Sequence, residues 1–242
     1  MQTTHSPSPS PAFRIVDFLR TAELTAMGDA IHETVDGVAR ALRTPYADSA
    51  PDQDLFHRLQ TVALANPVYA SALLTAVYAD AHLDPRITAL QDNPMLLAAI
   101  AQVSGPFEPT GMTIRVRVNV PAMPQTLHGW HSDVAIPRPV RADSTCHTLL
   151  GACWIPLCDT DADNGGLELV TAHLDAPLEH TRSETGRFVI PDALLEGLPR
   201  QTPAVRAGEA AVIGRYTPHR SLPTTGARVR WSVVAWVKGQ LR

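Results

Sequence analysis

Hydrophobic positions recur at helical spacing through the N-terminal part of the chain. Intervals of three and four separate Leu24, Met27, Ile31, Val35, Val38 and Leu42. This spacing places the side chains on one stripe of a helix, for which Thr21 is the expected cap. Further helices are predicted over residues 54–64 and 68–81, and another after Asn93. Residues 13–105 are therefore expected to be mainly helical and to form a layer that covers a sheet.

From Met112 onward, hydrophobic positions alternate with polar ones, as in a half-buried strand. The apolar set is Ile114, Val116, Val118 and Val120, and the polar set between them is Arg115, Arg117 and Asn119. Short strands are also predicted over residues 129–134, 148–157, 167–172, 209–214 and 229–237. Helices followed by many short strands indicate an α+β protein whose residues 112–242 form a β-sandwich or a jelly roll.

Composition describes one globular unit and excludes several classes of partner. Residues 1–12 are rich in Ser, Thr and Pro, lack the pattern of a secretory signal, and are expected to form a flexible tail before a single domain over residues 13–242. Of the 242 residues 45% are hydrophobic and 18% charged, and the net charge of -4 argues against a nucleic-acid partner. No apolar run is long enough to span a membrane. We expect a cytoplasmic protein, either a monomer or a homodimer.

Three cysteines, Cys146, Cys153 and Cys158, lie close together in the predicted strand region. Their odd number and apolar surroundings favour reduced, buried thiols. A zinc site is the alternative, although these cysteines lack the Cys-x-x-Cys pair typical of such sites.

The stretch from Thr126 to Asp133 contains the first candidate metal-binding residues. His131 and Asp133 are two residues apart, so their side chains point to the same face of an extended segment. An imidazole and a carboxylate are two members of the set of two histidines and one carboxylate that holds ferrous iron and leaves positions open for substrates. The pair alone also fits an ordinary surface or core contact, so a third ligand is needed to decide.

The last two predicted strands add a histidine and an arginine. His219 follows the strand over residues 209–214, while Arg228 and Arg230 share one face of the final strand among apolar residues. An unpaired guanidinium in apolar surroundings is costly, so Arg230 needs a partner. A dicarboxylic cosubstrate is one such partner.

Several ordered motifs in the second half of the chain belong together. They are Trp130-His131-Ser132-Asp133, Cys153-Trp154-Ile155-Pro156-Leu157 with Asp159, Asn164-Gly165-Gly166-Leu167, Gly208-Glu209-Ala210, Pro218-His219-Arg220-Ser221 and Arg228-Val229-Arg230-Trp231-Ser232. In order and spacing they resemble the phytanoyl-CoA dioxygenase family of Fe(II)/2-oxoglutarate oxygenases, and a looser likeness extends through the N-terminal helices. The resemblance implies a double-stranded β-helix, which is a jelly roll of the cupin type, with the N-terminal helices packed on one sheet.

The resemblance also implies a role for each site residue. By position, the ligands implied for Fe(II) are His131, Asp133 and His219. Arg230 is implied as the clamp for the distal carboxylate of 2-oxoglutarate, since a guanidinium can hold a carboxylate through two parallel hydrogen bonds. Ser221 is implied as a hydrogen-bonding helper and Trp154 as a wall of the same pocket. With O2, the implied reaction converts 2-oxoglutarate into succinate and CO2 and hydroxylates an unactivated C–H bond of a small molecule.

The carboxylate of Asp133 bears on the type of reaction. Halogenases of the same architecture carry a small residue in its place, so the resemblance favours hydroxylation over halogenation. Desaturation, epimerisation or ring closure could follow the same first step. Two alternatives stay open: a cupin-type metal oxygenase or isomerase that does not use 2-oxoglutarate, and a non-catalytic sheet domain that binds a metal or a small acid. The expected substrate is a small metabolite, either amino-acid-like or an intermediate of secondary metabolism.

Two segments depart from the family pattern or carry no motif. Val170-Thr171-Ala172-His173 stands where the family usually has Pro-Gly-Ser-His, so His173 is expected to be structural. Residues 135–146 are expected to form a loop near the iron. In that loop Arg138 and Arg141 either bind an acidic substrate group or are simply solvated.

Two other histidines call for separate predictions. In an extended segment, His128 and His131 would face opposite ways, so His128 is expected beside the site or at the surface. His180 has no motif around it and is expected to be a satisfied or exposed histidine.

Overall fold

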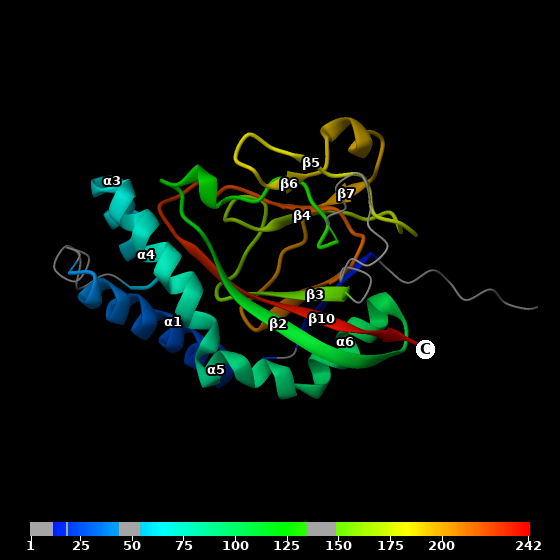
Figure 1. Cartoon of the computed structure of the whole chain (residues 1–242), viewed down its shortest axis with the longest axis horizontal. Coiled ribbons are helices and arrows are strands. Elements are labelled where there is room, and N and C mark those ends of the chain that lie inside the picture. Colours follow the sequence, from blue (N-terminus) through cyan, green and yellow to red (C-terminus); the bar gives the residue numbers. More distant parts are fainter. Residues whose placement is uncertain (1–11, 18, 44–53, 135–148) are drawn as a thin grey trace, which may run out of the picture.

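The computed structural model describes residues 12–17, 19–43, 54–134 and 149–242, and its elements separate into layers (Figure 1). A five-stranded antiparallel sheet lies in the middle. Helices pack on one face of this sheet, and a three-stranded antiparallel sheet packs on the other. This combination of helices with antiparallel sheets confirms the predicted α+β class.

The bounds of the elements follow the predicted order of helices first and strands afterwards. The helices are α1 (Thr21–Ala41), α3 (Arg58–Ala65), α4 (Pro67–Asp80), α5 (Pro85–Thr88) and α6 (Pro94–Ser104). The central sheet contains, in spatial order, β1 (Phe13–Asp17), β8 (Glu209–Gly214), β3 (Leu149–Pro156), β10 (Arg230–Leu241) and β2 (Phe107–Asn119). The second sheet contains β7 (Arg200–Gln201), β4 (Leu167–Val170) and β9 (His219–Ser221), and β5 (Thr181–Arg182) pairs with β6 (Phe188–Val189).

The helix ends agree with local capping chemistry, with one correction. The side chain of Asn93 accepts a hydrogen bond from the backbone N–H of Met95 at 2.9 Å, which confirms the predicted start of α6. At α1 the cap is Arg20 rather than Thr21. The carboxylate of Glu23 accepts the Arg20 backbone N–H at 2.8 Å, so this first turn is closed from the third helical position.

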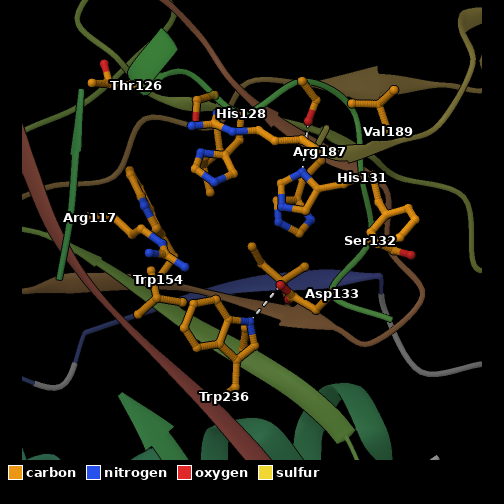
Figure 2. Close-up of a pocket in the computed structure, with 18 of the residues that line it drawn as sticks. Arg117, Thr126, His128, His131, Ser132, Asp133, Trp154, Arg187, Val189 and Trp236 are labelled. Carbon is orange, nitrogen blue, oxygen red and sulfur yellow. Dashed lines mark hydrogen bonds between the residues drawn. The ribbon is translucent and has the colours of Figure 1, made fainter. Parts of the chain in front are cut away.

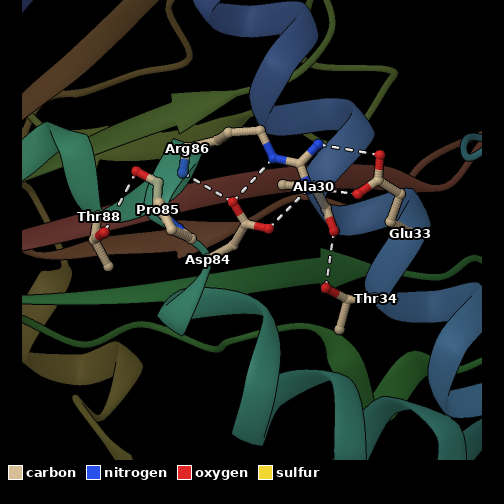
Figure 3. Close-up of polar contacts among 7 residues, drawn as sticks. All are labelled: Ala30, Glu33, Thr34, Asp84, Pro85, Arg86 and Thr88. Carbon is tan, nitrogen blue, oxygen red and sulfur yellow. Dashed lines mark hydrogen bonds and ion pairs between the residues drawn. The ribbon is translucent and has the colours of Figure 1, made fainter.

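Ion pairs connect α1 to α3 and α5, and Figure 3 shows the pair between α1 and α5. Arg86 of α5 reaches Glu33 of α1 at 2.6 Å and Asp84 at 2.8 Å. Arg58 of α3, which is buried, pairs with Asp36 of α1 at 2.8 Å. The apolar side of α1 packs on the core through Met27, Ala30, Ile31, Val35 and Ala39. Leu42, the last member of the predicted stripe, is exposed just beyond the helix.

The central sheet is covered on both faces, and this decides where its polar residues point. All eight residues of β3 are buried, as the continuous apolar run of its sequence predicts. On β10, the residues packed toward the helices are Trp231, Val233, Ala235 and Val237. On β2, Arg117 lies opposite Ser232, on the face that looks toward the second sheet. Arg117 on this polar side of β2 therefore lines a cavity rather than a fully solvated face.

Some predicted segments differ from the structure or lie outside its described part. Residues 129–134 do not form a strand, and an isolated bridge joins His131 to His219 instead. The tail predicted over residues 1–12 lies outside the described residues, apart from Ala12. None of the described helices has the length and apolar character needed to cross a bilayer.

Candidate metal centre

Three metal-binding side chains predicted from the sequence meet in the space between the two sheets. One ligand atom from each of His131, Asp133 and His219 lies within 4.8 Å of the others. The isolated bridge brings them together, because the His131 N–H donates to the His219 carbonyl at 3.0 Å and the reverse bond is 2.8 Å. Within the described residues, no other group of such side chains has the spacing of a metal site.

Backbone carbonyls fix the orientation of both imidazoles. The Nδ1–H of His131 donates to the Gly129 carbonyl at 2.8 Å, and that of His219 donates to the Thr217 carbonyl at 3.0 Å. A carbonyl can only accept, so Nδ1 carries the proton and the Nε2 lone pair is left for a metal. Burial, followed by the neighbouring His219, lowers the pKa of His131 to about 4. His131 is therefore neutral near pH 7, which is the form that binds a metal.

Asp133 presents one satisfied and one unsatisfied oxygen to the same space. Its Oδ1 accepts a hydrogen bond from the indole N–H of Trp236 at 2.6 Å (Figure 2), while its Oδ2 is buried and has no hydrogen-bond partner among the described residues. A buried carboxylate oxygen without a partner is costly, and a divalent cation would satisfy it. Two imidazole nitrogens and one carboxylate oxygen are the donor set that suits non-haem Fe(II). The residues present thus fit a ferrous ion.

A third histidine supports the segment that carries His131 and Asp133. The backbone N–H of Ser132 donates to Nε2 of His180 at 3.1 Å, and the Nδ1–H of His180 donates to the Leu178 carbonyl at 2.8 Å. His180 is buried, and this burial lowers its pKa, which keeps it in the neutral form that can accept from Ser132. The prediction of a satisfied histidine is confirmed, but its contact with the ligand segment had no signal in the sequence.

The three residues border a cavity of about 360 Å³. The other residues predicted for the site, Arg230, Ser221 and Trp154, line the same cavity. Its wall also includes His128, which was expected beside the site or at the surface, and Arg117, Arg187 and Trp236, which had not been predicted as site residues (Figure 2). The cavity thus combines a candidate metal centre with several cationic and aromatic side chains.

Arg230 is a buried cation without a carboxylate partner among the described residues. It is 3% exposed, its Nε–H donates to the Gly165 carbonyl at 3.0 Å, and one terminal N–H donates to Ser232 Oγ at 2.9 Å. Its guanidinium lies 5.4 Å from the ring centre of Trp154. Burial lowers the pKa of Arg230 to about 10, so the side chain is still charged near neutral pH. A carboxylate that entered the cavity could form charge-assisted hydrogen bonds with the Arg230 guanidinium.

Ser221 and His128 are linked through the backbone. Ser221 lies two residues beyond His219 on β9, so both side chains face the cavity, and its N–H donates to the His128 carbonyl at 2.9 Å. The rings of His128 and His131 have centres 5.6 Å apart, so His128 does not turn away from the site. The reason is that residues 129–134 are not an extended strand. Burial lowers the pKa of His128 to about 3, and the ring is neutral.

Other candidate residues lie away from the centre or outside the described part. Arg228, which was predicted to share a face of the final strand with Arg230, is exposed, stacks on Phe56 at 4.6 Å and does not line the cavity. His173 pairs with exposed Asp175 at 3.2 Å, away from the candidate metal centre. Arg138 and Arg141, with the loop over residues 135–146, lie outside the described residues.

The cysteines that the structure describes are buried thiols, as predicted. Cys153 and Cys158 are free and buried, and burial raises the pKa of Cys153 to about 12. Neither belongs to a group with metal-site spacing among the described residues. Cys146 lies outside the described part of the chain.

Comparison with solved structures finds proteins of similar fold. The non-heme monooxygenase ThoJ, in its apo form, has a TM-score of 0.52 at 16% identity, over 94% of this chain and 75% of its own. The non-heme α-ketoglutarate-dependent carbocyclase SnoK from nogalamycin biosynthesis has a TM-score of 0.50 at 16% identity, over 95% and 80%. At such identities the likeness supports the fold alone. A search of the curated proteins found no match.

A family model covers nearly the whole described chain. The model of phytanoyl-CoA dioxygenase (PhyH) matches residues 12–232 and therefore includes every predicted site residue. Members of this family are oxidoreductases that use Fe(II), 2-oxoglutarate and O2. The chain belongs to the phytanoyl-CoA dioxygenase family.

Proposed function

We propose that this protein is a dioxygenase that hydroxylates an unactivated C–H bond of a small metabolite and releases succinate and CO2 from 2-oxoglutarate. The observation that carries the proposal is one cavity bordered by a two-histidine, one-carboxylate set and by a buried arginine that has no carboxylate partner among the described residues. The first feature matches the needs of a ferrous ion, and the second matches a dicarboxylic cosubstrate.

In this proposal, His131, Asp133 and His219 hold the iron. When bound, ferrous iron supplies the activation of O2 that allows an unactivated C–H bond to be broken. The Gly129 and Thr217 carbonyls orient the two imidazoles, and Trp236 orients the carboxylate. The protein thus contributes a ligand set that is already in place before the metal binds.

Arg230, Ser221 and Trp154 are proposed to hold the cosubstrate. Arg230 has one face against Trp154, and its Nε–H and one terminal N–H are used by Gly165 and Ser232, so its remaining N–H groups are left for the distal carboxylate. The Ser221 hydroxyl borders the same cavity and can donate to that carboxylate. The apolar wall from Trp154 excludes water, which strengthens the charged contact.

Two features favour hydroxylation of a small substrate. Position 133 carries a carboxylate rather than the small residue that the resemblance associates with halogenases. The cavity has a volume of about 360 Å³, which suits a small substrate beside the cosubstrate. We assign hydroxylation rather than ring closure as the outcome, and product analysis separates the two.

The proposed architecture is a double-stranded β-helix formed by one domain over residues 13–242. The five-stranded and three-stranded sheets would be its two halves, since they pack on each other with the cavity between them. The helical layer would then stiffen the larger sheet on the face away from the site.

Succinate release tests this proposal directly. Purified protein with Fe(II), ascorbate and O2 should convert 2-oxoglutarate into succinate slowly when no substrate is present. The conversion should be faster when a panel of small metabolites includes a substrate. His131→Ala, Asp133→Ala and His219→Ala should each abolish succinate release, because a site with three protein ligands tolerates little loss. His173→Ala, an exposed histidine outside the cavity, is the matched control and should keep it. Iron binding without succinate from any substrate would contradict the proposal.

A further inference from the structure

Arg117 on β2 is a second cation in the cavity without an ion-pair partner among the described residues. It is half-buried, lines the cavity, and lies 5.4 Å from the ring centre of Trp236. Among the described residues it forms no ion pair and no hydrogen bond. Burial lowers its pKa, so the protein holds this cation against a desolvation cost. Figure 2 shows Arg117 and Asp133 entering the cavity from different sides, with the Trp236 ring next to both.

The proposed cofactors leave the charge of Arg117 without a counterpart. One carboxylate of 2-oxoglutarate would pair with Arg230, while the other would join Asp133 in balancing the two positive charges of the iron. Asp133 is the only acidic residue among the described residues that line the cavity. His128 is neutral and adds no charge. One positive charge, that of Arg117, is therefore left over when the metal and the cosubstrate are bound.

A third arginine in the cavity adds to this excess. Arg187, between β5 and β6, lines the cavity and donates to the carbonyls of Leu127 at 2.5 Å and Gln125 at 2.7 Å. These carbonyls accept hydrogen bonds but neutralise no charge. Asp133 is the acidic neighbour of Arg117 among the described residues that line the cavity, and the count above assigns its charge to the iron. An anion in the cavity would therefore be attracted to the remaining positive charge.

We propose that Arg117 binds the substrate itself through a carboxylate, so that the substrate is a small organic acid. This inference rests on the proposed function, because the charge count includes the metal and the cosubstrate. A guanidinium is suited to a carboxylate through two parallel hydrogen bonds. Arg117 also stacks on Trp236, which donates to Asp133, so an acid held there would lie beside the proposed metal ligand.

The test compares an acid with its neutral amide on protein saturated with Mn(II) and 2-oxoglutarate. Mn(II) replaces Fe(II) to prevent turnover, and saturating 2-oxoglutarate occupies Arg230. Calorimetric titration should give benzoate an affinity about 10-fold above that of benzamide, as expected for a charge-assisted contact. Arg117→Gln should remove this preference and leave the affinities for benzamide and 2-oxoglutarate within about twofold. Arg115→Gln is the matched control on the same strand, since Arg115 does not line the cavity, and it should behave like wild type.

Three results would overturn the assignment. In the first, wild-type protein binds benzoate and benzamide with equal affinity. In the second, the Arg117→Gln protein keeps the preference for benzoate. In the third, Arg117→Gln weakens the binding of 2-oxoglutarate as strongly as a substitution of Arg230 does. The last result would move Arg117 into the cosubstrate site. A preference for benzoate that depends on Arg117, in protein that releases no succinate with Fe(II), would support the acid site and contradict the proposed reaction.

Discussion

A single hydrogen bond sets which oxygen of Asp133 is free. The indole N–H of Trp236 is the one donor to this carboxylate among the described residues. Trp236→Phe removes the donor and keeps most of the aromatic surface. We expect the affinity for Mn(II) to fall about 10- to 100-fold, the usual effect of losing a group that orients a metal ligand. Electron paramagnetic resonance of the free ion measures that affinity.

Trp154→Phe is the matched control for this substitution. Trp154 lines the same cavity but contacts Arg230 rather than Asp133. Its replacement should leave the affinity for Mn(II) within about twofold and act on 2-oxoglutarate binding instead. Unchanged Mn(II) affinity in Trp236→Phe would mean that the carboxylate keeps its orientation without the indole.

Arg230 should dominate the affinity for 2-oxoglutarate. Arg230→Gln removes the buried charge that faces the cavity, so a carboxylate there would lose a charge-assisted contact. We expect the dissociation constant of 2-oxoglutarate, measured by calorimetry with Mn(II) present, to rise about 10- to 100-fold. Arg228→Gln, two residues earlier and exposed, should leave it unchanged. Equal affinities in the two variants would remove Arg230 from the cosubstrate site.

Sequence patterns could identify some of these residues and not others. His131, Asp133 and His219 stand in motifs whose order is visible along the chain. Arg117 was visible only as a polar residue in an alternating strand, a pattern that is the same whether water or another sheet covers the polar face. The contact of His180 with Ser132 joins residues far apart in sequence, so no local pattern could predict it.

At the scale of elements, the turn before β4 supports Arg230. Asp161 Oδ1 accepts the backbone N–H groups of Asp163 at 2.9 Å and Asn164 at 3.2 Å, and this turn presents the Gly165 carbonyl to Arg230. Gly165 has a φ of 87°, which favours glycine. A Cβ there would lie 3.3 Å from Cβ of Arg230. The Asp, Asn and Gly residues of this turn therefore serve the site as well as the chain reversal.

Gly165→Ala should damage both stability and cosubstrate binding. The strained backbone should lower the free energy of unfolding by about 1–3 kcal/mol, measured by urea denaturation. Displacement of Arg230 should also lower the affinity for 2-oxoglutarate. Gly226→Ala is the control, because no atom lies within 4 Å of the Cβ it would add. A Gly165→Ala protein with normal stability and normal 2-oxoglutarate affinity would show that the turn relaxes without moving Arg230.

Long, buried elements were predictable, and short ones were not. The apolar runs of β3 and β8 and the capped start of α6 match their predicted positions closely, because burial and capping leave local signals. The segment around His131 resembles a strand in sequence, yet it makes only a bridge to β9. The two-residue strands β5, β6 and β7 are too short for any period to appear.

At the scale of the whole molecule, the site joins parts of the chain that are distant in sequence. Asp133 meets Trp236 of β10, His131 meets His219 of β9, and Arg230 meets the turn at Gly165. The layers make these contacts possible, since helices cover one face of the central sheet and leave the other for the cavity. An unfolded chain would hold none of these groups together, so ligands of the site should bind the folded state selectively.

Such selective binding predicts a thermal shift that depends on both ligands. A ligand that binds only the folded state, present at about 100 times its dissociation constant, raises the free energy of unfolding by about 2.7 kcal/mol. For a chain of this size, that raises Tm by about 5–10 °C. Mn(II) should raise Tm, 2-oxoglutarate should raise it further only when Mn(II) is present, and a chelator should reverse both effects. Asp133→Ala should lose the response to Mn(II), because it removes the buried oxygen that has no hydrogen-bond partner among the described residues. A 2-oxoglutarate shift that is equally large without metal would mean that the acid binds through Arg230 alone, and the proposed pairing of its other carboxylate with the metal would then be wrong.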